Sequence, residues 1–225
     1  TEISYRQFAA FVKATGYVTE AEQFGWSFVF EPLASKEDVA KVDKGLGRVK
    51  DATHWLACKG ATWMYPHGPG TDVSTLYLGP RVEAGYSASS HTNFIGGFPV
   101  TQVSYNDAHE YCIWANRRLP TEEEWEYAAR GMARRNQSYP WGDGKTFEPH
   151  RLNIWEGKLP GKRPNSAPHA GGEPKGLADG FLGLAPIKAL GAQTDEGLYH
   201  MLGNVWEWVA HVATTNASPS ASASS

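Results

Sequence analysis

Two long stretches of this chain, roughly residues 50–100 and 132–198, lack both the helical and the strand periodicity of apolar residues. Stretches this long are uncommon in compact domains unless they bind a metal ion or shape a groove. The 225 residues include 24 Gly and 14 Pro, an excess that favours turns and argues against a helical bundle. Nine Trp, ten Tyr and nine Phe supply enough apolar surface for a substantial core, which excludes disorder over most of the chain.

The charges are nearly balanced, with 21 Lys and Arg against 24 Asp and Glu, so the composition predicts no nucleic-acid partner. The longest apolar runs, such as Trp26 to Phe30, are far shorter than the ~20 residues of a membrane-spanning helix, and no membrane span is predicted. Residues 213–225 are rich in Ser and Ala and contain no large apolar side chain. We expect them to form a disordered tail.

Four short patterns predict where helices begin. In each, a hydroxyl residue stands three positions before an acid or amide, the spacing of the capping box. The pairs are Ser4 with Gln7, Thr19 with Glu22, Ser104 with Asp107, and Thr121 with Glu124. They predict helices over about 5–14, 20–24, 105–116 and 122–130, with Gly16 and Gly131 as C-terminal stops and a strand at 26–31.

The last patterned segment, Gly203 to Trp208, predicts a strand with Val205 and Glu207 on one side and Trp206 and Trp208 on the other. This segment is also one of three that place side-chain oxygens beside Gly or loop backbone. The other two are 153–155 and 179–181. Calcium takes six to eight oxygen ligands, and loop carbonyls are suitable donors. Asx turns, in which Asn and Asp bond to nearby backbone, explain the same residues and remain the alternative.

The chain has two cysteines, Cys58 and Cys112, whose spacing fits no zinc or redox motif. They either form one disulfide or are two buried thiols. Cys112 lies on the apolar face of the predicted helix 105–116, where burial would raise its pKa and suppress the thiolate. Cys58 follows Trp55, Leu56 and Ala57 in what we expect to be a loop.

Taken together and in order, several segments closely resemble the sulfatase-modifying factor family, the family of formylglycine-generating enzyme. The resemblance covers about residues 1–209. It rests on TGYVTEAE at 15–22, FGWSFVF at 24–30, VSYNDA at 103–108, RLPTEEEWE at 118–126, YPWG at 139–142, NIWEG at 153–157, GLY at 197–199 and GNVWEW at 203–208.

The resemblance implies a single α+β domain over residues 1–212, with little regular secondary structure and a fold related to C-type lectins. We expect this domain to be incomplete, because the family's opening strand and its later cysteine-bearing segment have no counterpart here. The implied reaction is oxidation of a sulfatase cysteine to Cα-formylglycine in the endoplasmic reticulum lumen, using oxygen and copper held by two cysteines. The implied partners are sulfatase polypeptides or a paralogue of the enzyme.

The resemblance also implies two structural calcium ions. One would take the side chains of Asn153 and Asp179 and the carbonyls of Ile154 and Phe181. The second would take Glu207 and the carbonyls of Gly203 and Val205. At position 200 the family supplies Asn where this chain has His200, and imidazole is a poor ligand for a hard cation. Trp206 corresponds to an aromatic residue that lines the substrate groove, although a core tryptophan is the alternative.

Neither Cys58 nor Cys112 matches the family's copper ligands. The sequence therefore predicts that this chain does not make formylglycine by itself. A non-catalytic module that binds sulfatases or the active enzyme, as implied by the paralogue, is the alternative function. The sequons at Asn136 and Asn216 are compatible with the secretory pathway.

Overall fold

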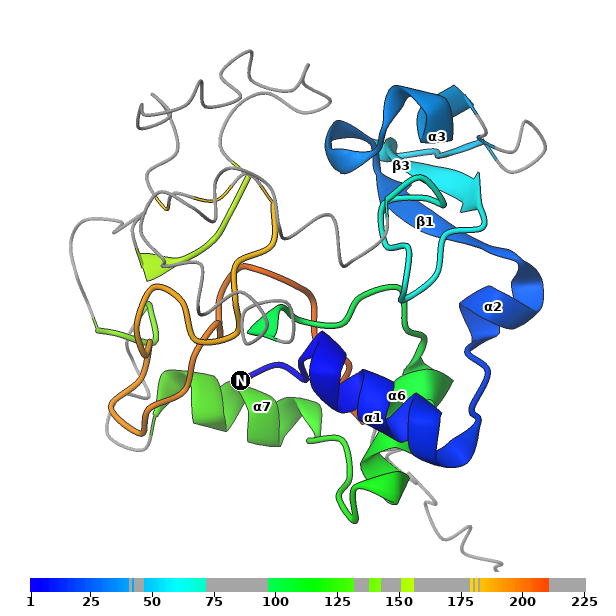
Figure 1. Ribbon diagram of the computed structural model, residues 1–225. Coiled ribbons are helices and arrows are strands. Elements are labelled where there is room, and N and C mark those ends of the chain that lie inside the picture. Colours follow the sequence, from blue (N-terminus) through cyan, green and yellow to red (C-terminus); the bar gives the residue numbers. More distant parts are fainter. Residues whose placement is uncertain are drawn as a thin grey trace, which may run out of the picture.

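The computed structural model describes residues 1–40, 42, 47–71, 97–131, 138–142, 151–155, 179, 181 and 183–210. The predicted tail at 213–225 and the sequon residues Asn136 and Asn216 lie outside these ranges. The helices and strands, shown in Figure 1, are α1 (Tyr5–Thr15), α2 (Glu20–Phe24), β1 (Trp26–Phe30), the 3-10 helix η1 (Glu31–Leu33), α3 (Lys36–Ala40), β2 (Arg48–Val49), β3 (Ala52–Lys59), α6 (Tyr105–Trp114) and α7 (Glu122–Arg130). None of the helices in these ranges has both the length and the apolar character needed to cross a membrane.

All four predicted capping boxes are present, and they begin α1, α2, α6 and α7. In each, the hydroxyl accepts from the backbone N–H three residues later while that residue's side chain accepts from the cap backbone. Gly16 ends α1 in the left-handed conformation, as predicted. The helix predicted to reach residue 116 ends at Trp114, because Asn116 has a φ of 53° and Arg117 N–H bonds to the Cys112 carbonyl at 2.7 Å.

A small antiparallel sheet has the strand order β1–β3–β2. Strand β1 was predicted, whereas β2 and β3 lie at or beside the start of the stretch for which no strand was expected. The prediction that Cys58 lies in a loop is wrong, since Cys58 is on β3 opposite Ser27. Leu56, Ala57 and Cys58 are all fully buried, so β3 lacks the alternation of a strand with one exposed face. The helix α3 and the turn η1 were not predicted.

Two small apolar clusters hold these elements together. The first joins Phe8 and Phe11 of α1 to Tyr111 of α6 and to Trp63, with Phe8 and Trp63 ring centroids 5.4 Å apart. The second lies against the sheet and contains Val29, Leu56, Cys58 and Ala61. Figure 1 shows α1 beside α6 at one end of the molecule and α3 beside the sheet at the other.

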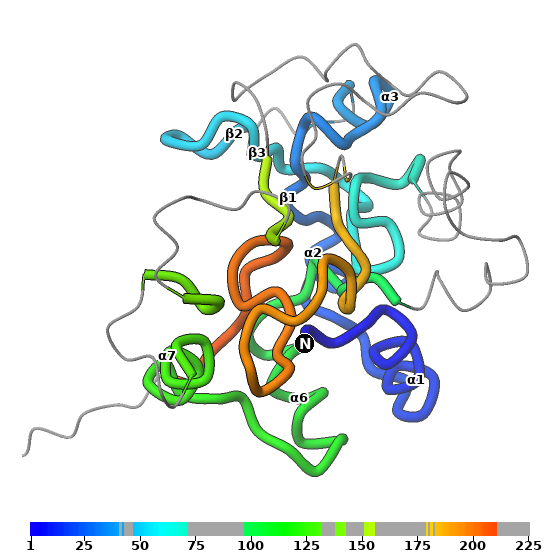
Figure 2. Tube along the Cα trace, turned by 90° about the vertical axis from the view of Figure 1, so that its left-hand side faces the viewer, coloured from blue at the N-terminus to red at the C-terminus, as the bar shows by residue number. Residues whose placement is uncertain are grey.

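The segment from 183 to 210 crosses the middle of the molecule without forming a helix or a strand (Figure 2). The strand predicted at 203–208 is therefore wrong. Gly203 and Asn204 both have positive φ values, 85° and 65°, which turn the backbone where a strand would need extended residues. The segment ends where Ala210 N–H donates to the Pro120 carbonyl at 2.7 Å, just before α7 begins.

Candidate functional site

At the first predicted calcium site, Asp179 lies against the backbone of Ile154 and Phe181, the two residues whose carbonyls were predicted as further ligands. The Asp179 carboxylate is buried, and its two oxygens accept from Phe181 N–H at 2.8 Å and from Ile154 N–H at 3.3 Å. The bond to Phe181, two residues ahead, is the Asx turn that was the competing explanation for this residue. Such a turn and a cation are compatible, because each carboxylate oxygen has more than one lone pair.

Asn153 is buried beside the second predicted loop. Its amide nitrogen donates to the Gly183 carbonyl at 2.6 Å and to Asn204 Oδ1 at 2.8 Å. Its carbonyl accepts from Asn204 N–H at 2.7 Å. A Cβ atom on Gly203 would lie 2.5 Å from the same carbonyl, so the close approach requires glycine. The loop at 153–155 and the loop at 203–208 are therefore in direct contact.

Asn204 makes the contact between the loops, although no role was predicted for it from the sequence. Its side chain also accepts from Ala185 N–H at 2.8 Å, donates to the Ala185 carbonyl at 3.1 Å and donates to Glu2 Oε1 at 2.8 Å. The Gly-Asn pair, typical of left-handed turns, was the available signal for Asn204. For Glu2 no local signal exists, because its partner lies at the other end of the chain.

Glu207 faces the same region. Its Oε2 accepts from Trp125 Nε1–H of α7 at 2.8 Å. Burial raises the pKa of Glu207, and the nearby Glu2 carboxylate raises it further, against the lowering effect of the Trp125 bond. Burial also raises the pKa of Glu2. His200 is buried and has its Nε2 2.9 Å from the Pro186 carbonyl. Burial lowers the pKa of His200, which favours the neutral ring.

The residues predicted to bind calcium offer only oxygen atoms as ligands to a hard cation. Within the described ranges, no three side chains of His, Cys, Asp or Glu lie close enough to hold a metal ion together, so a transition-metal site of that kind is not formed there. Calcium differs in accepting backbone carbonyls, of which both loops have several. Among the described residues, the buried Glu2 Oε2 has no hydrogen-bond partner, and such an orphaned oxygen fits a cation ligand. The donor set therefore fits calcium, with His200 contributing no oxygen.

The copper that the resemblance implies does not fit the two cysteines. Both thiols are free, so the disulfide alternative is wrong for this structure. Cys58 is fully buried in the cluster under the sheet, whereas Cys112 packs against the cluster between α1 and α6. Burial raises the pKa of Cys112, as predicted, which disfavours the thiolate that copper binds.

Trp206 is 93% exposed, which makes the alternative of a core tryptophan wrong. Its ring centroid lies 6.3 Å from that of Trp55 on β3, and Trp55 in turn contacts Phe30. Trp206 lines two cavities. One, of about 660 Å³, opens toward α7, and the other, of about 320 Å³, is bounded by α6 and the first residues of the chain. The site therefore pairs an accessible aromatic surface with two hollows.

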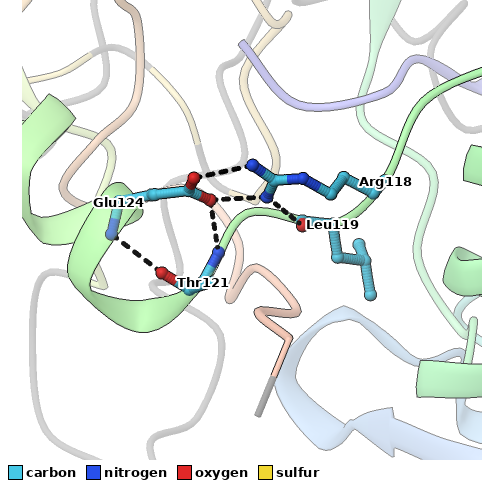
Figure 3. Close-up of polar contacts among 4 residues, drawn as sticks. All are labelled: Arg118, Leu119, Thr121 and Glu124. Carbon is cyan, nitrogen blue, oxygen red and sulfur yellow. Dashed lines mark hydrogen bonds and ion pairs between the residues drawn. The ribbon is translucent and has the colours of Figure 1, made fainter. Parts of the chain in front are cut away.

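Arg118 and Leu119 line the smaller cavity. Figure 3 shows their polar contacts at the start of α7. Arg118 donates from both terminal nitrogens to Glu124, at 2.6 and 2.7 Å, and one of these nitrogens also donates to the Leu119 carbonyl. The same Glu124 closes the capping box with Thr121. The Arg118 guanidinium, helped by the Thr121 N–H, lowers the pKa of Glu124 to about 2. The arginine is thus held at the start of α7.

The amino-acid sequence is similar to a known protein family and to several characterised proteins. Residues 1–222 match the family model described as the Sulfatase-modifying factor enzyme 1-like domain. The chain is 43% identical over 213 residues to the formylglycine-generating enzyme of Thermomonospora curvata, covering 92% of this chain and 57% of that protein. It is 41% identical over 210 residues to the inactive C-alpha-formylglycine-generating enzyme 2 of Bos taurus, again covering 92% of this chain and 57% of that protein. The chain thus spans little more than half the length of these relatives.

Proposed function

Because the chain belongs to the family of the Sulfatase-modifying factor enzyme 1-like domain, we propose that it binds sulfatase polypeptides at the surface around Trp206. The similar proteins include enzymes named for making formylglycine and paralogues named as inactive, so binding of the polypeptide is the step that both kinds of relative could share. The observation that carries the proposal is the 93% exposure of Trp206, which lines two cavities. An exposed indole held by its backbone supplies a large contact surface at low entropic cost.

The backbone around Trp206 supports this role. Asn204, two residues earlier, is tied to Asn153 and Ala185, and Glu207, the next residue, is tied to Trp125. Trp208 Nε1–H donates to the Val103 carbonyl at 3.0 Å. An exposed side chain on so constrained a segment is already positioned before a ligand arrives, which reduces the cost of binding.

In this proposal the 225-residue chain binds the sulfatase cysteine without oxidising it. Copper-dependent oxidation needs thiolates that can hold the metal beside the substrate. The buried Cys58 and the half-buried Cys112, with its raised pKa, are unsuited to that task and lie in different clusters. Sulfatase binding is therefore the function proposed for these 225 residues, and formylglycine formation is the activity for which the similar enzymes are named.

Calcium has a structural role in the proposal. The first ion would be held by the side chains of Asn153 and Asp179 with the carbonyls of Ile154 and Phe181, and the second by Glu207 with the carbonyls of Gly203 and Val205. When bound, the two ions would neutralise the buried carboxylates of Asp179 and Glu207 and fix the loops at 153–155 and 203–208 against each other. We further propose the C-type-lectin-related fold and a place in the endoplasmic reticulum lumen, both on the family alone.

A binding experiment tests the proposal. A fluorescent peptide containing the sulfatase sequence Cys-x-Pro-x-Arg is titrated with the chain, and binding is followed by anisotropy. Trp206→Ala should weaken binding about tenfold or more, as is typical when an aromatic anchor is removed. Phe24→Ala is the matched control, because Phe24 is also a strongly exposed aromatic residue, at 65%, but lies at the end of α2. Equal affinity of the two variants for the peptide would contradict the role of Trp206.

A second experiment tests the absence of oxidation. The chain is incubated with copper, oxygen and the same peptide, and mass spectrometry follows conversion of the cysteine to the aldehyde. We expect no conversion above a control without protein. Conversion that disappears in Cys58→Ser or Cys112→Ser would contradict the non-catalytic proposal and leave the peptide-binding proposal standing.

A further inference from the structure

Strand β1 lies at one edge of the three-stranded sheet, where it pairs with β3 (Figure 1). At the start of this pair, Gly60 N–H donates to the Gly25 carbonyl at 2.9 Å. In an antiparallel pair, residues whose backbone bonds to the neighbouring strand alternate with residues whose backbone points away from it. Because Gly25 bonds to β3, the backbone N–H and C=O groups of Trp26 and Phe28 point away from the sheet.

Neighbouring hydrogen bonds agree with this alternation. Ala57, opposite Phe28, donates its N–H to the Gly47 carbonyl at 3.0 Å, on the side of β3 that faces β2. The Phe30 carbonyl, on the outer side of β1, accepts from Ala34 N–H at 3.3 Å. In the part of the chain that the structure describes, no residue bonds to the outward backbone groups that precede Phe30. These groups are therefore available to another strand.

The side chains along this edge are apolar and accessible. Phe28 is 40% exposed, and its ring centroid lies 5.2 Å from that of Trp26. The segment 24–30 contains no charged residue and no proline. Charged side chains and proline are common means by which proteins keep an edge strand from pairing with another chain. Strand β1 has neither of these protections.

A second copy of this chain fits the edge in a definite register. Two β1 strands related by a two-fold axis, with Phe28 opposite Phe28, would turn their outward backbone groups toward each other. Trp26 would then lie opposite Phe30 of the second copy, and aromatic pairs of this kind stabilise neighbouring strands. Glu31, the first charged residue after the strand, would lie opposite Gly25, so this register places no like charges together.

The edge of a second copy is also ordered before the two copies meet. A flexible polypeptide would lose conformational freedom on forming the same backbone bonds, whereas β1 is already extended by its pairing with β3. The contact is small, because a whole aromatic side chain buries only about 150–250 Å². Stable interfaces bury about 800 Å² on each partner. The association should therefore be weak and depend on protein concentration.

We propose that two copies of this chain associate through the outer edge of β1, which joins their sheets into one continuous antiparallel sheet. This inference needs only the open edge and does not depend on sulfatase binding. It does place the second copy near the proposed binding surface, since Phe30 of β1 contacts Trp55, and Trp55 contacts Trp206.

Sedimentation of the whole chain over a range of micromolar concentrations tests the proposal. The average mass of the wild type should rise from 24.7 kDa toward twice that value as the concentration increases. Phe28→Lys places two positive charges opposite each other and should weaken the association about tenfold or more. Tyr127→Lys is the matched control, because Tyr127 is an aromatic residue of α7 that is 45% exposed. It should associate as the wild type does.

Two outcomes of the sedimentation experiment would overturn the proposal. One is a wild-type mass that stays at 24.7 kDa at every concentration. The other is equal association of wild type and Phe28→Lys. Far-UV circular dichroism and the melting temperature of each variant show whether it is folded, and the cross-linking experiment does not depend on the lysine variant.

Disulfide cross-linking tests the register. Residues opposite each other in a hydrogen-bonded antiparallel pair have Cα atoms about 5.5 Å apart, which is within the range of a disulfide. Mild oxidation of Phe28→Cys should therefore give a covalent dimer on a non-reducing gel. Tyr127→Cys is the control for an exposed thiol, and the wild type gives the background from Cys58 and Cys112. Equal cross-linking of all three chains would overturn the pairing through Phe28.

The anisotropy titration with the Cys-x-Pro-x-Arg peptide separates this inference from the proposed function. If Phe28→Lys loses peptide binding while the wild-type mass stays at 24.7 kDa, an extended polypeptide occupies the edge and the second copy is overturned. If the wild type associates but binds no peptide, the association stands and sulfatase binding fails. Association that is lost in Phe28→Lys, with peptide binding lost in Trp206→Ala, supports both.

Discussion

Glu2 and Asn204 are 202 positions apart in the sequence and share a hydrogen bond of 2.8 Å. The bond fixes the start of the chain against the last described loop, and Figure 2 shows the N-terminus beside that segment. Backbone bonds reinforce the position of the first residues, since Val100 N–H donates to the Ile3 carbonyl and Tyr5 N–H to the Phe98 carbonyl. The surface around Trp206 therefore depends on both ends of the described chain.

Asn204→Ala should lower the free energy of unfolding by about 2–4 kcal/mol, because it leaves buried partners of the amide without hydrogen bonds. The measurement is equilibrium unfolding in urea. Asn116→Ala is the control, since Asn116 also has a positive φ, 53°, but is exposed at the end of α6. Equal losses in the two variants would mean that backbone conformation, and not the contacts of Asn204, explains the effect.

Comparing the stability of Gly203→Ala with that of Gly197→Ala separates the cost of a strained backbone from the cost of a clash between a new Cβ atom and its neighbour. The two glycines have similar φ values, 85° and 82°, so alanine should cost each about 1–3 kcal/mol of strain. Only at Gly203 would the new Cβ meet another atom, the Asn153 carbonyl oxygen at 2.5 Å, whereas Gly197 has open space. Gly203→Ala should therefore lose about 1–3 kcal/mol more than Gly197→Ala in thermal or urea unfolding. Equal losses would show that the two loops can separate freely.

The four helices that begin with capping boxes, α1, α2, α6 and α7, were predictable from sequence because their starting signals are local, whereas α3 has no such signal and was missed. A capping box needs only two residues three positions apart, and Gly16 needs only its own backbone freedom. The strand β3 was missed because Leu56, Ala57 and Cys58 are buried together, which removes the alternation by which a strand is recognised. Its existence depends on pairing with β1, a contact that no local pattern encodes.

The residues of the candidate site likewise fall into those that local sequence predicts and those that it does not. Asn153, Asp179 and Glu207 were predicted from motifs, but the segment 203–208 was predicted to be a strand with Val205 and Glu207 on one side and Trp206 and Trp208 on the other. The positive φ values of Gly203 and Asn204 were not predicted. Glu2 could not be found from sequence, because nothing near it indicates burial and its partner is 202 residues away.

Tyr17→Phe should lower the free energy of unfolding by about 1 kcal/mol, the usual contribution of one hydrogen bond. The Tyr17 hydroxyl donates to Asp107 Oδ1 at 3.0 Å, and the same oxygen accepts from Glu20 N–H at 3.1 Å. Asp107 thereby connects α2 to α6, and burial together with this carboxylate raises the pKa of Tyr17. Tyr127→Phe, at an exposed residue of α7, should change stability by less than about 0.5 kcal/mol. If the two tyrosine variants unfold alike, the link through Asp107 contributes nothing.

His67 should make the fold sensitive to mild acid. Its side chain is buried, and burial lowers its pKa to about 4 from the ordinary value of 6.5. The unfolded chain takes up the proton first as the pH falls. The stability that neutral His67 contributes is therefore complete above pH 6.5 and lost progressively toward pH 4. The full loss is on the order of 3 kcal/mol.

The measurement is the free energy of unfolding in urea at several values between pH 7 and pH 4, for wild type, His67→Gln and His109→Gln. Buried carboxylates with raised pKa values, such as Glu2 and Glu207, act in the opposite direction, since the folded state then holds the proton more tightly. Comparing variants cancels these contributions, which all three chains share. His67→Gln should flatten the fall in stability, whereas His109→Gln, at an exposed position on α6, should retain the wild-type slope. An unchanged slope in His67→Gln would mean that His67 takes up its proton equally in the folded and unfolded chains.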